Sequence, residues 1–246
     1  MQPRITFSSV TALALSLMTG AFGLSFITGS VFAAGYLTGF IDIENVMTGV
    51  SNGFYGLLSC LSPIVMLMEL VGLVMLFSDG AQVSPAQKNL TRIAVALFAS
   101  CVLLLLMASA FNIAATQSGS LALAQAAYIL QSLMVIVETL AIVLGTFELA
   151  SNRHRLVIAV SMAASTLATT ASMIVCAASL QMKMVTVMNV QTYVAVPMMD
   201  FRGPFYLTVS VISLLGVLVM TAVFFRMSVE AWKIIREREP IVDPAA

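Results

Sequence analysis

Charged residues are scarce in this chain. Asp, Glu, Lys and Arg make up 9% of its 246 residues, and the formal net charge at pH 7 is zero. A soluble domain of this length needs far more charge to cover its surface, so a large soluble domain is excluded. A chain without net charge is also unsuited to bulk electrostatic binding of nucleic acid, and we expect no direct nucleic-acid partner.

Aromatic residues and cysteines are few as well. Aromatic residues make up 8% of the chain, with a single Trp, so large aromatic belts are absent. The three cysteines, Cys60, Cys101 and Cys176, lie in apolar stretches, and we interpret them as small hydrophobic side chains. No nucleophile triad, zinc signature, P-loop or dinucleotide-binding motif is present. We therefore expect no metal, no cofactor and no enzymatic activity.

Long apolar runs dominate what remains. The chain is 60% hydrophobic, with a mean hydropathy of +1.04. A helix needs about 20 apolar residues to cross a bilayer, and six segments qualify: 9–32, 56–77, 93–115, 126–147, 156–180 and 205–225. The runs are continuous and do not alternate, which favours helices over barrel strands. The sequence therefore predicts an all-α integral membrane protein with about six transmembrane helices.

Basic residues concentrate in alternate connections between these segments, and the connection 181–204, with Lys183, Asp200 and Arg202, is the one mixed case. The connection after the second segment and the one after the fourth each carry two, and further bases follow the last segment: Lys88 and Arg92, Arg153 and Arg155, then Arg226 and the tail. Cytoplasmic connections are enriched in Lys and Arg. We therefore expect a multi-pass protein of the bacterial inner membrane with both termini and both basic tips in the cytoplasm.

The first apolar segment has two interpretations. Arg4, the apolar run and Val31-Phe32-Ala33 resemble a signal peptide with a small-residue cleavage site. The run is longer than the usual apolar part of a signal peptide, which favours a retained helix. Cleavage would leave the remaining topology unchanged, with the new N-terminus outside.

Two stretches of the chain look like copies of one hairpin. The first reads SPIVMLMELVGLVMLF, a polar loop ending in KNLTR, then IAVALFASCVLLLLMASAF; the second reads SLMVIVETLAIVLGTF, ELASNRHR, then LVIAVSMAASTLATTASMIVCAASL. Glu69 aligns with Glu138, and Asn89-x-x-Arg92 aligns with Asn152-x-x-Arg155. We expect two tandem parallel hairpin repeats, and divide the chain into 1–40 (first segment), 41–118 and 119–182 (repeats), and 183–246 (outer connection, last helix and cytoplasmic tail).

The two aligned carboxylates, Glu69 and Glu138, lie in the middle of apolar helices. A carboxylate at membrane depth costs several kcal/mol unless it is neutral, paired or facing water. One interpretation is a proton relay or a polar point lining a pore. The alternative is a buried protonated acid that bonds helices together.

The fifth segment carries small and hydroxyl residues on one helical face, by i+3/i+4 spacing: Ser161, Ser165, Ala168, Thr169 and Ser172. Such a face permits close backbone approach, so we interpret it as a helix-packing face, in the chain or against another subunit. A water-lined wall is the alternative.

The stretch from about 41 to 115 contains an apolar helix, a short basic loop and a second helix rich in Leu and Ala. In this layout it resembles small hydrophobic inner-membrane proteins of type IVB secretion and conjugation systems, the IcmD/DotP and IcmC/DotE group. The resemblance implies a structural or channel-forming subunit that assembles with other inner-membrane subunits or with further copies of itself as a homo-oligomer. The alternative from the residues themselves is a small ion-coupled transporter that uses the intramembrane carboxylates. The subunit requires partners, whereas the transporter requires a cavity that holds Glu69 and Glu138.

Overall fold

Six long helices make up most of the structure. The computed structural model describes residues 8–39, 61–83, 85–147, 149–187, 190–198 and 200–237. Its helices are α1 (Ser9–Thr38), α4 (Leu61–Val83), α5 (Pro85–Ser118), α6 (Leu121–Thr146), α7 (Asn152–Ala178) and α8 (Pro204–Arg236). All six are long and apolar enough to cross a membrane. The expected helical segments are therefore confirmed as helices, whereas Cys60 and the start of the stretch that carries the family resemblance lie outside the described residues.

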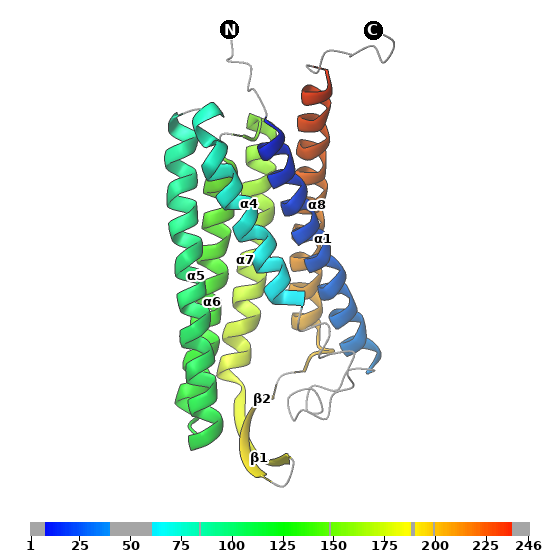
Figure 1. Ribbon diagram of the computed structural model, residues 1–246. Helices are drawn as coiled ribbons and strands as arrows, with labels where there is room; N and C mark the ends of the chain where they lie inside the picture. The colour runs from blue at the N-terminus through cyan, green and yellow to red at the C-terminus, as the bar shows by residue number, and fades with distance from the viewer. Residues whose placement is uncertain are drawn as a thin grey trace.

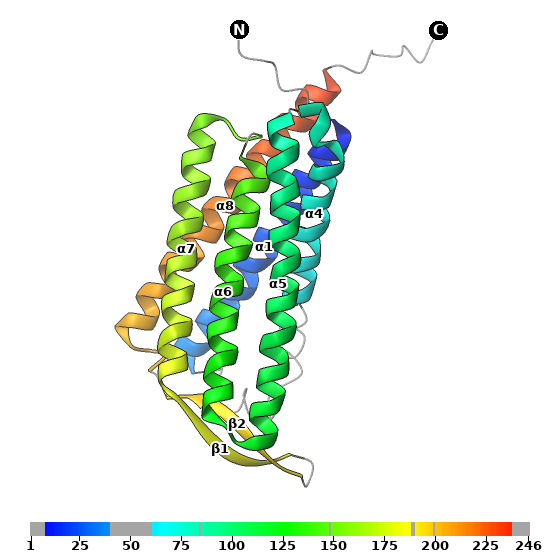
Figure 2. The ribbon, with the colours of Figure 1, turned by 90° about the vertical axis from the view of Figure 1, so that its left-hand side faces the viewer.

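The helices form a ring in chain order. Consecutive helices run in opposite directions, each packs against the next, and α8 packs against α1 to close the ring (Figures 1 and 2). The start of α1 and the end of α8 lie at one end of the bundle with the α4–α5 and α6–α7 connections, and we call this the termini end (Figure 1). The opposite end is the hairpin end. Helices from all four expected segments of the chain thus share one bundle.

A β-hairpin gives the hairpin end its name. Strands β1 (Leu180–Val187) and β2 (Val190–Pro197) pair antiparallel, with Leu180 opposite Pro197. The expectation of an all-α chain is wrong here, because the outer connection is a β-hairpin. Apolar and polar residues alternate only in the first half of β1, from Leu180 to Met184, whereas β2 contains the continuous apolar run Val194-Ala195-Val196. The hydroxyl of Thr192 donates to the Thr116 carbonyl at 3.3 Å, which ties β2 to the end of α5.

Three helices, α5, α6 and α7, begin four or more residues earlier than the hydropathy pattern predicts, α6 at Leu121 instead of residue 126. Helix α5 starts at Pro85, since proline has no N–H and fits the first turn of a helix. Lys88 and Arg92 therefore lie on its first two turns, not in a loop. Helix α7 starts after Ser151, whose side chain accepts a hydrogen bond from the His154 backbone N–H. Each basic tip is thus the exposed beginning of a helix.

A dry apolar core fills the termini half of the bundle. Ala14, Leu15 and Met18 of α1 are fully buried in it. Phe22 of α1 and Phe224 of α8 stack in the same core, with ring centroids 5.3 Å apart. The outward faces of the helices carry exposed leucines instead, such as Leu103, Leu106, Leu156 and Leu167. An apolar exterior of this extent fits a multi-pass membrane protein.

Candidate functional site: a carboxyl pair inside the bundle

The two carboxyl groups that stand out in the sequence meet in the structure. Glu69 lies on α4 and Glu138 on α6, and their side chains line the same cavity, close enough to interact electrostatically. They meet because α4 and α6 touch directly, although α5 separates them in the chain. Glu69 is 3% exposed and Glu138 is partly buried. Sequence reasoning selected both residues without indicating that they form a pair.

The pair lines a cavity of about 130 Å³ in the middle of the bundle. Five helices contribute to the wall: α1, α4, α6, α7 and α8. Ser25, Ser165 and Thr166 supply hydroxyl groups, and none of the described residues that line the cavity is Lys, Arg or His. The Oε2 atom of Glu69 is buried and has no hydrogen-bond partner. One acceptor in the cavity therefore remains free for a proton, a water or a cation.

The electrostatics of this arrangement restrict its chemistry. Two adjacent carboxylates repel each other, and among the described residues no basic side chain lines the cavity to balance them. The pair is therefore stable in an apolar setting only with at least one proton or with a bound cation. A cavity of about 130 Å³ has room for a few waters, which allow a proton to reach the pair. The site is suited to taking up and releasing a proton.

Hydroxyl groups connect the helices around the pair. Thr139 of α6, next to Glu138 in the chain, hydrogen-bonds Thr166 of α7 at 2.5 Å. On the hairpin side, Ser213 of α8 hydrogen-bonds the hydroxyls of Ser165 at 3.3 Å and Thr169 at 3.1 Å. The polar lining of the site is thus continuous from α6 through α7 to α8.

The small-residue face of α7 lies against α8 in the same chain. A Cβ atom at Gly216 would come within 2.8 Å of the Ser161 carbonyl oxygen and of the Ser165 Cβ atom. Ala168 is 7% exposed, and Thr169 bonds to α8. The structure therefore places this face inside the bundle, with both a packing role and a polar lining role. Sequence reasoning missed the matching face of α8, although Ser210, Ser213 and Gly216 recur there at three-residue spacing.

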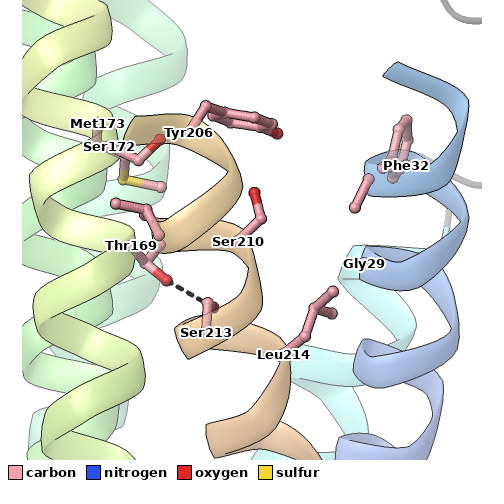
Figure 3. Close-up of a pocket in the computed structure, with 11 residues that line it drawn as sticks. Gly29, Phe32, Thr169, Ser172, Met173, Tyr206, Ser210, Ser213 and Leu214 are labelled. Carbon is pink, nitrogen blue, oxygen red and sulfur yellow. Dashed lines mark hydrogen bonds between the residues drawn. The ribbon is translucent and has the colours of Figure 1, made fainter. Parts of the chain in front are cut away.

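A second cavity lies next to the first, toward the hairpin end. It has a volume of about 240 Å³ and lies between α1, α7 and α8 (Figure 3). Thr169, Ser172, Ser210 and Ser213 contribute hydroxyls, and Tyr206 lies near its hairpin side (Figure 3). Thr169 and Ser213 line this outer cavity and also bond each other, while Ser165 lines the carboxyl cavity. Three hydrogen-bonded hydroxyl groups therefore lie between the two cavities, two of them in the lining of the outer cavity and one in that of the carboxyl cavity.

The residues of the two basic tips lie apart from the carboxyl pair, at the termini end, whereas Lys183 in β1 and Arg202 just before α8 lie at the hairpin end. Lys88, Arg92 and Arg153 are exposed. Arg155 donates through Nε to the Ala150 carbonyl at 2.9 Å, and its guanidinium lies 4.7 Å from the centroid of the Phe147 ring. Arg155 therefore stabilises the α6–α7 connection, apart from any effect of its positive charge on the orientation of the protein in the membrane.

A third buried acid in an apolar helix, Asp79, was not selected from the sequence. Asp79, near the end of α4, is 5% exposed and accepts hydrogen bonds from the hydroxyls of Ser8 and Thr11. Ser8 is the N-cap of α1, so a carboxylate from α4 lies at the N-terminus of α1. Its position within the polar segment SDGAQ made it look like a loop residue. We interpret it as a structural clasp between the two helices.

Among the described residues, no group of three or more His, Cys, Asp or Glu side chains is placed to hold a metal ion. No protein-family model, curated protein or solved structure matches this chain. The interpretation of the site therefore depends on its own geometry.

Proposed function

We propose that this chain is a small proton-coupled membrane transport protein in which Glu69 and Glu138 exchange the coupling proton. The observation that supports it is that the two carboxyl groups share one cavity, with no basic partner among its described lining residues. Buried acids inside a membrane bundle are costly, and proton relays are a main reason for keeping them. The proposed location is the bacterial inner membrane, with the termini end in the cytoplasm.

The proposal requires the pair to change protonation reversibly while the protein stays folded. Infrared spectroscopy follows the carbonyl stretch of a protonated carboxyl group directly. In the purified protein we expect such a band, which disappears reversibly as the pH is raised and is absent from the Glu69→Gln/Glu138→Gln variant. Glu230→Gln is the matched control, because Glu230 is exposed and paired with Arg226 at 2.9 Å, so the band should persist there.

Each outcome of that titration has a definite meaning. A band that responds to sodium concentration at constant pH would identify the coupling ion as a metal cation and overturn the proton proposal. A band that responds to neither would make the pair a fixed helix-bonding element, which leaves no ion coupling at this site. In liposomes with a trapped pH-sensitive dye, the wild-type chain should move protons and the double Gln variant should not.

The second candidate is a structural or channel-forming subunit of a type IVB-like secretion or conjugation apparatus. It is supported by the layout of α4 and α5, two apolar helices joined at a basic tip, which is the layout of the group named above. Its partners would be other inner-membrane subunits. Genes for secretion ATPases beside this one, together with loss of the protein when its neighbours are deleted, would favour this candidate over the transporter.

A further inference from the structure

The surroundings of the carboxyl cavity differ between its two sides. On the termini side its wall is apolar: Phe22, Ile142 and Met162 all belong to the buried core. Beyond them, Phe224 stacks on Phe22 and Met220 is fully buried. On the hairpin side the wall carries hydroxyls, among them Ser165 one helical turn from Met162. The wall of the cavity is therefore apolar on one side of the pair and polar on the other.

We infer that protons reach the carboxyl pair from the hairpin end, through the outer cavity and the hydroxyls of Thr169, Ser213 and Ser165, while the Phe22–Phe224 stack closes the termini end. This inference rests on the proposed function, since it describes the path by which the coupling proton reaches the carboxyl pair. The outer cavity of about 240 Å³ supplies room for water. Ser213, which bonds both other hydroxyls, is the positioning residue that links the outer cavity to the inner one.

Few other titratable groups face this route. Cys101 of α5 is close enough to both carboxyl groups to interact with them electrostatically, and Tyr206 of α8 lines the outer cavity near Cys176 of α7. Among the described residues, no Lys, Arg, His or Asp lines either cavity. Proton transfer along the route therefore depends on hydroxyls and water, with the carboxyl pair as its end point.

The route predicts which positions water-soluble reagents reach. We would place single cysteines in a background with Cys60, Cys101 and Cys176 changed to Ala, and add an impermeant methanethiosulfonate to right-side-out and inverted membrane vesicles. Ser210→Cys, in the outer cavity, should react from the hairpin side only. Met220→Cys, in the dry half, should react from neither side. Met184→Cys on β1 and Arg153→Cys at a basic tip are exposed controls for the two sides.

Ser172→Cys, in the same cavity, replaces Ser210→Cys if that variant does not accumulate. The route would be overturned if the outer-cavity cysteine reacted from the same side as Arg153→Cys. It would also be overturned if that cysteine reacted from neither side while Met184→Cys reacted.

A second measurement tests the link at Ser213. After a pH jump, the infrared band of the carboxyl pair should respond about tenfold or more slowly in Ser213→Val, because the relay hydroxyl is lost at nearly constant shape. Ser213→Thr, which restores a hydroxyl, should recover the rate. An unchanged rate in Ser213→Val would overturn the route while leaving the proposed function intact, whereas a band that never responds to pH would overturn the proposed function itself.

Discussion

Gly216 of α8 lies directly against Ser165 of α7, so close that a Cβ atom at position 216 would fall 2.8 Å from the Ser165 Cβ atom. The Ser161 carbonyl oxygen lies at the same distance from that point. This contact holds the hydroxyls of α7 and α8 within hydrogen-bonding distance of one another. Where helices pack in lipid, small residues permit this close approach.

Gly216→Ala should therefore destabilise the bundle. The new methyl group meets a backbone oxygen that cannot move away independently of its helix, and overpacking of this kind costs about 1–3 kcal/mol. Thermal unfolding in detergent measures the effect. Gly23→Ala is the control, because the nearest atom to its new Cβ is the Thr221 methyl carbon at 3.8 Å, an ordinary contact. Equal melting temperatures for the two variants would show that α7 and α8 are not packed this closely.

Asp79→Ala should loosen the clasp between α4 and α1. The hydroxyls of Ser8 and Thr11 lose their shared acceptor, and hydrogen bonds to a charged group contribute about 1.5–3 kcal/mol each. Asp79→Asn keeps an accepting oxygen and should cost less. Asp200→Ala, which removes one exposed hydrogen bond from the Arg202 backbone N–H at 2.9 Å, is the comparison and should lower the melting temperature less. If Asp79→Ala melted like wild type, the clasp would not contribute to stability.

The two basic tips should be cytoplasmic and the β-hairpin should lie outside. Bases favour the cytoplasmic side, and both tips lie at the termini end of the bundle (Figure 1). In intact cells an impermeant maleimide should label Met184→Cys, whereas Arg153→Cys should be labelled only after the membrane is opened. Labelling of Arg153→Cys in intact cells would reverse the orientation.

Helix α1 should remain in the mature protein. It supplies the fully buried side chains Ala12, Ala14, Leu15 and Met18, and it joins α8 to α4 to close the ring. Its removal would expose Phe224 and the rest of that core. Intact-mass measurement of the protein purified from membranes should show a chain that includes residues 9–33. A mature N-terminus just after Ala33 would show instead that the first segment is a cleaved signal and that the bundle closes without it.

Hydropathy predicted the helices well because it is a property of local sequence. An apolar run of about 20 residues must satisfy its own backbone hydrogen bonds inside lipid, and a helix does this without help from the rest of the chain. The β-hairpin was missed because regular alternation is confined to the first half of β1, and because the two strands lie between two much stronger apolar signals. Asp79 was missed because its partners, Ser8 and Thr11, lie at the far end of the sequence.

The sequence by itself determined that the chain folds as six apolar helices and that Glu69 and Glu138 are costly residues in two of them. Tertiary structure alone decided that α8 closes on α1, that the two acids share one cavity, and that hydroxyls lie on one side of it and an apolar core on the other. The reason is physical: the cost of one buried acid follows from its own neighbours in the chain. Whether it finds a second acid depends on the register of α4 and α6, which is set by side-chain packing across the whole bundle.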